Sequence, residues 1–89
     1  MLYHQIDFTK SFTKQFKTLR ENQKTRFYER LELLKKNPHD RILRDHALKG
    51  NYKGYRSIDI EGDLRALYYI KVDVIIIFAF IGSHNQLYN

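Results

Sequence analysis

The strongest constraint on the fold of this chain is an unbroken apolar run at residues 74–81, which contains only Val, Ile, Phe and Ala. A helix that spans a membrane needs about 20 apolar residues, so this run is too short to cross a bilayer. Its β-branched and aromatic side chains favour a strand, and the lack of polar alternation indicates that both faces of that strand are covered. We therefore expect a soluble protein in which this segment is a central strand of a sheet.

The length of 89 residues predicts a single domain that spans residues 1–89. Apolar residues make up 43% of the chain and aromatic residues 15%, which is enough for one core in a domain of this size. The chain has no cysteine, which excludes disulfides and thiolate metal sites and is typical of a reducing compartment. The N-terminal residues also lack the apolar segment of a secretory signal peptide, so we expect a cytoplasmic protein.

The first 38 residues predict a short strand followed by two helices. Residues 2–8 alternate imperfectly, as a short strand does. Apolar residues then recur three or four positions apart, at Phe8, Phe12, Phe16 and Leu19 and again at Phe27, Leu31 and Leu34. Thr9 can cap the first helix, residues 21–23 mark a break, and Asn37-Pro38 ends the second helix. The short connection predicts an antiparallel helical hairpin.

The remaining residues predict three strands, at 55–60, 64–70 and 74–81. The segment Glu61-Gly62-Asp63 indicates a hairpin turn between the first two, residues 71–73 a second turn, and Gly82 the end of the last strand. Alternation along the middle strand sets Arg65 on the face opposite Ala66 and Tyr68. The order of elements predicts an α+β fold: an N-terminal strand, a two-helix hairpin, and a three-stranded antiparallel meander in one mainly antiparallel sheet.

Positive charge is concentrated in one part of the chain. The sequence has 16 Lys and Arg against 10 Asp and Glu, a net charge of +6. Residues 9–36 hold nine basic and three acidic side chains, so the whole excess lies there. Such a surface attracts a polyanion, although a solvated helical face of ordinary basic character has the same composition. The candidate docking residues are Lys10, Lys14, Lys17 and Lys24.

Four polar residues stand where the predicted strands begin or end: His46, Asp63, Arg65 and His84. Each has a purely structural explanation, because Asp63 can form the turn, Arg65 can pair with Asp63 or Glu61, His46 can cap locally or pair with Asp45, and His84 can be an ordinary loop residue. As a set they match the cleavage of RNA without a metal. That reaction needs a base for the ribose 2′-hydroxyl, a cation for the phosphorane and an acid for the leaving 5′-oxygen.

No metal or cofactor is expected, because the histidines lack the spacing of a zinc site and no glycine-rich phosphate loop is present. Tyr88 lies four residues after His84, where an aromatic ring can stack on an unpaired base or simply pack beside Leu87.

The residues at these positions resemble the RelE/ParE toxin superfamily, and most closely its YafQ-like branch. The similarity rests on DHALKG at 45–50, KGYR at 53–56, GDLRALY at 62–68, GSH at 82–84 and the terminal Leu87-Tyr88. It spans the chain, and the predicted order of elements agrees with it. The resemblance implies a RelE-like fold. It further implies the toxin of a type II toxin–antitoxin pair, an endoribonuclease (mRNA interferase) that cuts mRNA on the ribosome and blocks translation.

The resemblance also implies roles for individual residues. His46, Asp63 and His84 fall on YafQ-type catalytic positions, and Tyr88 falls where that branch has a substrate-stacking aromatic residue. Arg65 matches a RelE-type catalytic arginine. Arg56 matches a RelE catalytic lysine and, with the nearby Lys53, is a candidate substrate-binding residue. Asp59 stands where the branch has a further histidine and Leu64 where it has a tryptophan, so either His46 or Asp63 is left as the general base.

The expected partners are the ribosome, mRNA and an acidic antitoxin that wraps the toxin with a segment that folds on binding. Two other functions fit parts of the sequence. A ParE-like inhibitor of DNA gyrase would need no acid or base, and a nuclease-inactive RNA-binding or repressor module would use only the basic helices. The presence of His84 together with an aromatic residue at 88 favours the endoribonuclease.

Overall fold

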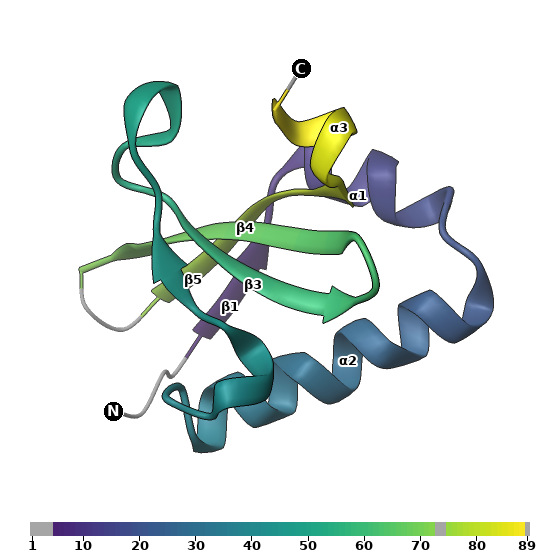
Figure 1. Cartoon of the computed structure of the whole chain (residues 1–89), viewed down its shortest axis with the longest axis horizontal. Coiled ribbons are helices and arrows are strands. Elements are labelled where there is room, and N and C mark those ends of the chain that lie inside the picture. The colour runs from purple at the N-terminus through teal and green to yellow at the C-terminus, as the bar shows by residue number, and fades with distance from the viewer. Residues whose placement is uncertain (1–4, 73–74, 89) are drawn as a thin grey trace.

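The computed structural model describes residues 5–72 and 75–88, which form a twisted five-stranded sheet with two helices packed against one face (Figure 1). Its elements are β1 (Gln5–Phe8), α1 (Lys10–Lys17), α2 (Glu21–Lys36), β2 (His46–Ala47), β3 (Arg56–Glu61), β4 (Leu64–Lys71), β5 (Ile75–Ser83) and α3 (His84–Tyr88), with the 3₁₀ turns η1 (Arg41–Leu43) and η2 (Gly50–Tyr52). The strand order is β1-β5-β4-β3-β2, and only the β1–β5 pair is parallel. The predicted α+β fold with a mainly antiparallel sheet is confirmed, and β5 is a central strand. Among the residues described, no helix is long and apolar enough to cross a membrane.

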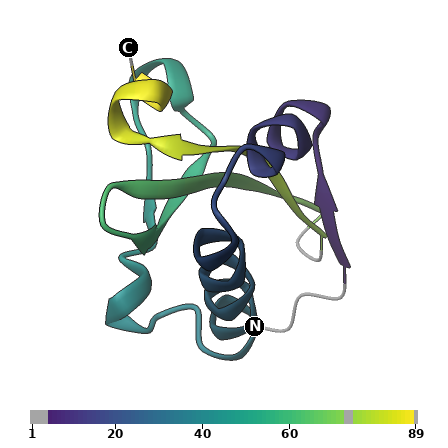
Figure 2. The ribbon, with the colours of Figure 1, turned by 90° about the vertical axis from the view of Figure 1, so that its right-hand side faces the viewer.

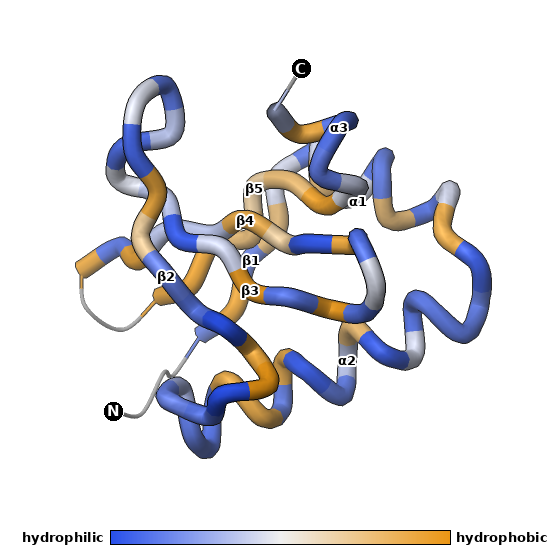
Figure 3. The backbone as a smooth tube through the Cα atoms, viewed as in Figure 1, coloured by the Kyte–Doolittle hydropathy of each residue, from blue (hydrophilic) through white to orange (hydrophobic). Residues whose placement is uncertain are grey.

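The core lies between the sheet and the two long helices, as the view in Figure 2 shows. Phe12 of α1, Phe27 of α2 and Phe78 of β5 meet there, with ring centroids 5.2 Å apart for both Phe12–Phe27 and Phe27–Phe78. Figure 3 shows why this packing follows from the sequence, since hydrophobic residues dominate β5 whereas α2 alternates between hydrophobic and hydrophilic positions. Arg30 also ties α2 to β3, because its Nε donates to the Ile60 carbonyl at 3.2 Å.

Hydrogen bonds at the helix ends show where each helix starts. The Thr9 hydroxyl accepts from the Phe12 N–H at 3.0 Å and donates to the Ala79 carbonyl at 2.7 Å, so the predicted cap is confirmed and also anchors α1 to β5. The predicted break at residues 21–23 is wrong. Gln23 reaches back to accept from the Arg20 N–H at 3.0 Å, which starts α2 at Glu21 and leaves the break at residues 18–20.

The predicted strands agree with the structure except at their ends. The hairpin turn is confirmed, with Gly62 in the left-handed region at φ +50°. The expectation that Gly82 ends the last strand is wrong, because Gly82 pairs with Arg65 and Ser83 with Leu64, so β5 continues through Ser83. The parts of the predicted strands and turn at residues 2–4 and 73–74 lie outside the described residues.

Two short elements, β2 and α3, were not predicted from the sequence. The start of α3 has a readable signal, since the Ser83 hydroxyl accepts from the Gln86 N–H at 3.2 Å while the Gln86 side chain accepts from the Ser83 N–H at 2.8 Å. This reciprocal pair is a capping box, with the pattern Ser-x-x-Gln. It makes the chain turn away from the sheet directly after β5, at the residue before His84.

A buried carboxylate links the second half of the sheet. Asp45 accepts from Arg56 Nε at 3.0 Å and from the Tyr68 hydroxyl at 2.7 Å. Burial, followed by the hydrogen bond to Asp45 and its charge, raises the pKa of Tyr68 far above the ordinary value of 10.0. The phenol therefore keeps its proton in the folded protein at a pH where it ionises in the unfolded chain.

This pKa difference predicts an alkaline loss of stability. The contribution of Tyr68 is complete below pH 10 and declines above it, by about 1.4 kcal/mol for each pH unit, because the unfolded state then binds fewer protons. Urea unfolding between pH 9 and 11 measures this slope. Tyr68→Phe is expected to reduce it, whereas Tyr28→Phe, at an exposed tyrosine, is expected to leave it unchanged. Equal slopes in the two variants would contradict the assignment.

Candidate active site

The sheet register brings residues that are distant in sequence into one row. Asp59 of β3 lies opposite Arg65 of β4, and Arg65 lies opposite Gly82 of β5. His46 lies opposite Ser57, which is two residues from Asp59 on β3 and so on the same face, and Arg44 reaches this face through its side chain, whose Nε lies 3.5 Å from Asp59. Residues that face each other across neighbouring strands share one face of a sheet. This row therefore occupies the face turned away from α1 and α2, as alternation predicted for Arg65.

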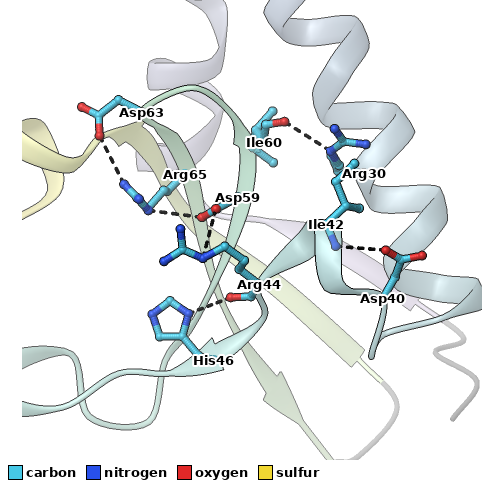
Figure 4. Close-up of polar contacts among 9 residues, drawn as sticks. All are labelled: Arg30, Asp40, Ile42, Arg44, His46, Asp59, Ile60, Asp63 and Arg65. Atoms are coloured by element: carbon cyan, nitrogen blue, oxygen red, sulfur yellow. Dashed lines mark hydrogen bonds and ion pairs between the residues drawn. The ribbon is translucent and has the colours of Figure 1, made fainter.

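Ion pairs connect the members of this row (Figure 4). The Asp59 carboxylate lies between two guanidinium groups, with Oδ1 3.3 Å from Arg65 Nε and Oδ2 3.5 Å from Arg44 Nε. Arg65 also donates from Nη1 to Asp63 Oδ1 at 3.2 Å. Of the two expected partners of Arg65, Asp63 is thus present, whereas Glu61 lies 3.9 Å from Arg26. Two carboxylates hold Arg65 in a fixed orientation.

Arg65 and Asp59 are more shielded from solvent than an ordinary surface ion pair. Their side chains are 18% and 19% exposed, whereas that of Asp63 is 62% exposed. Arg65 uses Nε and Nη1 for its two carboxylates, and across the described part of the chain its Nη2 has no ion pair or hydrogen bond. A guanidinium presents its donors in a planar fork, so the free edge can bind a phosphate.

The imidazole of His46 is oriented by backbone. Its Nδ1 lies 2.7 Å from the carbonyl oxygen of Arg44, as Figure 4 shows. A carbonyl oxygen only accepts hydrogen bonds, so Nδ1 is the donor and carries a proton. In the neutral ring Nε2 is then free to accept a proton. The expected pairing of His46 with Asp45 is wrong, because Asp45 binds Arg56 and Tyr68 instead.

His84 and Tyr88 lie at the same end of the sheet, on a short helix that follows the last strand. Both belong to α3, where a spacing of four puts them on one side of the helix, and their ring centroids are 4.7 Å apart. Because Ser83 pairs with Leu64, the chain leaves β5 beside the β3–β4 turn that holds Asp63. The exposed ring of His84 is therefore next to the end of the sheet that carries Arg65.

A groove lies between α3 and the segment around η2. It has a volume of about 380 Å³ and is lined by Leu48, Lys49, Asn51, Tyr52, Leu87 and Tyr88. The Tyr52 hydroxyl donates to the Leu87 carbonyl at 2.5 Å, and its ring contacts that of Tyr88 with centroids 5.4 Å apart. Aromatic rings beside a lysine are the surface to which a single-stranded nucleotide binds.

Two of the candidate substrate residues lie apart from this groove. Arg56 pairs with Tyr68 across the β3–β4 ladder, which sets it on the helix side of the sheet, opposite the face of Arg65. Burial lowers the pKa of Arg56, but the charge of Asp45 and the hydrogen bond to it outweigh this effect, so the pKa is raised. Lys53 is exposed just after η2. Among the residues that the structure describes, no hydrogen bond or ion pair joins either residue to the His46–Arg65 row.

The basic surface is formed mainly by α1. Lys10, Lys14 and Lys17 are exposed, and the structure of the described residues gives none of them an acidic partner. Lys24 differs, because its Nζ lies 3.5 Å from Glu21 and its side chain is only 26% exposed. Between the C-terminal end of α1, the β3–β4 turn and α3 lies a polar cleft of about 660 Å³, and both Asp63 and Gln86 line it.

Arg44 and Asp59 are members of the site that sequence reasoning missed. Arg44 stands in a polar linker, and no periodicity indicates which strand it faces. Asp59 has a stronger signal, since it departs from the histidine of the YafQ-like pattern. Its pairing with two arginines shows that this position carries a fixed negative charge that the pattern lacks.

Solved structures with similar folds come from bacterial toxins. A crystal structure of YafQ from Escherichia coli BL21(DE3) superposes with a TM-score of 0.81 at 26% identity and covers 94% of this chain and 97% of its own. A copper-bound mutant toxin from Helicobacter pylori is 33% identical, with a TM-score of 0.76 and coverage of 99% and 100%. The E. coli DinJ–YafQ toxin–antitoxin complex matches at 25% identity and a TM-score of 0.79, over the full length of both chains.

A sequence comparison with curated proteins found no match. A family model described as the bacterial toxin of type II toxin–antitoxin systems, YafQ, matches residues 4–89. That match spans nearly the whole chain and includes every residue of the site described above. The chain therefore belongs to the YafQ family of type II toxin–antitoxin toxins.

Proposed function

We propose that this toxin is an endoribonuclease that cleaves mRNA on the ribosome and thereby blocks translation in the cytoplasm. The observation that carries the proposal is the position of Arg65. Two carboxylates fix its guanidinium on the sheet face that also holds His46, at the end of the sheet from which α3 presents His84. An oriented cation between two imidazoles is what cleavage through the 2′-hydroxyl requires.

In this mechanism each residue has one task. Nε2 of His46 takes the proton of the ribose 2′-hydroxyl, and the 2′-oxygen attacks the adjacent phosphorus. The free edge of Arg65 stabilises the charge that develops on the phosphorane oxygens. His84 donates a proton to the 5′-oxygen as the P–O5′ bond breaks, which leaves a 2′,3′-cyclic phosphate and a free 5′-hydroxyl. Tyr88 holds a neighbouring base by stacking, and Asp63 orients Arg65 rather than acting as the base.

The decisive test compares translated mRNA with the same RNA free in solution. The site is an open sheet face with few catalytic groups, so we expect the ribosome to supply the substrate orientation. Primer extension is expected to show cuts in the A-site codon only when ribosomes are translating. Equal cutting of free RNA would refute the ribosome dependence, and an uncut message would refute the nuclease.

The gyrase inhibitor is the main alternative, and the same experiment separates the two functions. Inhibition of DNA supercoiling by the purified protein, without any cut in translated mRNA, would establish a ParE-like activity. A nuclease-inactive binding module would associate with ribosomes and leave both mRNA and supercoiling intact.

We propose that Lys10, Lys14 and Lys17 bind ribosomal RNA. Changing all three to glutamate replaces three positive charges with three negative ones, takes the net charge of +6 to zero, and is expected to weaken ribosome association and its salt dependence. Sedimentation with ribosomes at several salt concentrations measures both effects. A matched control changes Lys35, Lys36 and Lys71 to glutamate, which gives the same net charge on other parts of the surface. If the two variants bind equally, net charge rather than α1 determines binding.

We also infer that an acidic antitoxin neutralises this chain, as the DinJ–YafQ complex suggests for a relative. An apolar hollow of about 210 Å³ on the helix side offers a place for it, lined by Phe8, Phe12, Thr13, Phe16, Phe27 and Tyr28. Phe8 and Tyr28 are 43% and 53% exposed there, beside the lysines of α1. Hydrogen exchange on the complex separates two modes of inhibition. Protection of residues 9–36 indicates that ribosome docking is blocked, and altered exchange at residues 82–88 indicates that the active site is disturbed.

A further inference from the structure

Arg44 has an unusual backbone conformation that nothing in the proposed reaction explains. Its φ is +46°, and within residues 5–72 and 75–88 Val72 is the only other non-glycine residue with a positive φ. An L-residue with a side chain avoids this left-handed region, because Cβ crowds the backbone there. Such strain persists only where the surrounding structure holds it in place.

The preceding residues hold Arg44 in this conformation. Asp40 caps η1 by accepting from the Ile42 N–H at 3.0 Å (Figure 4). The Arg44 N–H closes the turn on the Arg41 carbonyl at 3.2 Å. The intervening Leu43 is fully buried in the core. Arg44 thus ends η1 in the left-handed conformation. Its carbonyl oxygen lies 2.7 Å from Nδ1 of His46, two residues further along the chain.

We propose that Arg44 is the positioning residue of the general base: its left-handed backbone holds the Nδ1–H tautomer of His46, so that Nε2 faces the substrate without a proton. This proposal rests on the proposed function for its consequence, but the tautomer itself is a property of the free protein. A free imidazole in water prefers the opposite tautomer, with the proton on Nε2, in which the ring cannot act as a base at that atom. The Arg44 carbonyl reverses this preference.

The side chain of Arg44 has a separable role. Its guanidinium lies 3.5 Å from Asp59 and its side chain is 66% exposed, so any substitution removes this ion pair. The backbone, in contrast, responds differently to each new residue. Glycine adopts a φ of +46° without strain, alanine does so with some strain, and valine is disfavoured there by its branched Cβ.

The test therefore compares Arg44→Gly with Arg44→Val. Both variants lose the guanidinium, but glycine adopts the left-handed conformation readily and valine does not. Nitrogen-15 NMR of the histidine side chains, at a pH where imidazoles are neutral, reports which ring nitrogen of His46 carries the proton. We expect the Nδ1–H form in the parent and in Arg44→Gly, and mainly the Nε2–H form in Arg44→Val. Single-turnover cleavage is expected to fall about 10- to 100-fold more in Arg44→Val than in Arg44→Gly, the range found when a group that orients a metal-binding histidine is removed.

Other outcomes overturn the proposal or separate it from the function. An Nε2–H ring in the parent, or the same tautomer in all variants, overturns it. So does equal cleavage by the glycine and valine variants. If circular dichroism shows that Arg44→Val does not fold, Arg44→Ala replaces it, with an intermediate tautomer ratio as the expected result. If the tautomers behave as expected but the parent cleaves no mRNA, the positioning by Arg44 stands and the nuclease function fails.

Discussion

Replacing Arg65 with alanine is expected to lower the single-turnover rate of mRNA cleavage by about 10²- to 10⁴-fold, because in the proposed mechanism its guanidinium stabilises the charge on the phosphorane. The same substitution also removes one of the two guanidinium groups beside the shielded Asp59 carboxylate and leaves the exposed Arg44, 3.5 Å away, as the other. A partly buried charge that loses a partner destabilises a protein, so a loss of activity could arise from unfolding alone.

A double variant separates these two causes. Arg65→Ala combined with Asp59→Asn removes the charge of the carboxylate together with the cation and is expected to recover stability without recovering cleavage. Chemical denaturation measures the first property and single-turnover cleavage the second. If the double variant cleaves at a rate near that of the parent, Arg65 acts as a structural ion pair and has no part in the chemistry.

The second large effect is expected at His84. Its exposed position on α3 means that His84→Ala removes little packing, so we expect an unchanged fold, nearly unchanged ribosome binding and a cleavage rate about 10²- to 10⁴-fold lower. Asn85→Ala is the matched control, since this neighbour is also exposed on the same short helix. Cleavage at the parental rate by His84→Ala would remove His84 from the mechanism.

A modified substrate identifies the role of His84 more directly. Sulfur in place of the bridging 5′-oxygen makes a leaving group that departs without protonation. If His84 is the general acid, His84→Ala and the parent are expected to cleave this substrate at similar rates. A defect of the same size on both substrates would instead assign His84 to substrate positioning.

The sequence was sufficient to predict the α+β fold, the central strand and the face of Arg65. These features depend on side-chain periodicity, and a strand period of two leaves no ambiguity about which residues share a face. The capping box that starts α3 is also recognisable in the sequence, and it would have predicted that His84 and Tyr88 share one helix.

The pairing of Asp59 with Arg65 was not predictable in the same way. Glu61 pairs with Leu64, and an unbroken ladder would then put Ile60 opposite Arg65. An irregularity between Asp59 and Glu61 shifts the register by one residue and brings Asp59 opposite Arg65 instead. A bulge of this kind depends on the tertiary structure around the turn. The contact between Arg44 and His46 likewise depends on a backbone conformation that no side-chain pattern encodes.

The one parallel pair in the sheet has a consequence for how this protein folds. It joins Gln5 to Ile75, so the chain must close a loop of about 70 residues before β1 can pair, at an entropic cost of about 4 kcal/mol. The β3–β4 and β4–β5 hairpins close much shorter loops and carry Asp59, Arg65 and the approach to α3. We expect pulsed hydrogen exchange during refolding to show that the amides of these hairpins gain protection before those of β1. Earlier protection of the β1 amides would contradict this order. The strands that carry the candidate site would then form first from local contacts, and β1 would pair with β5 last.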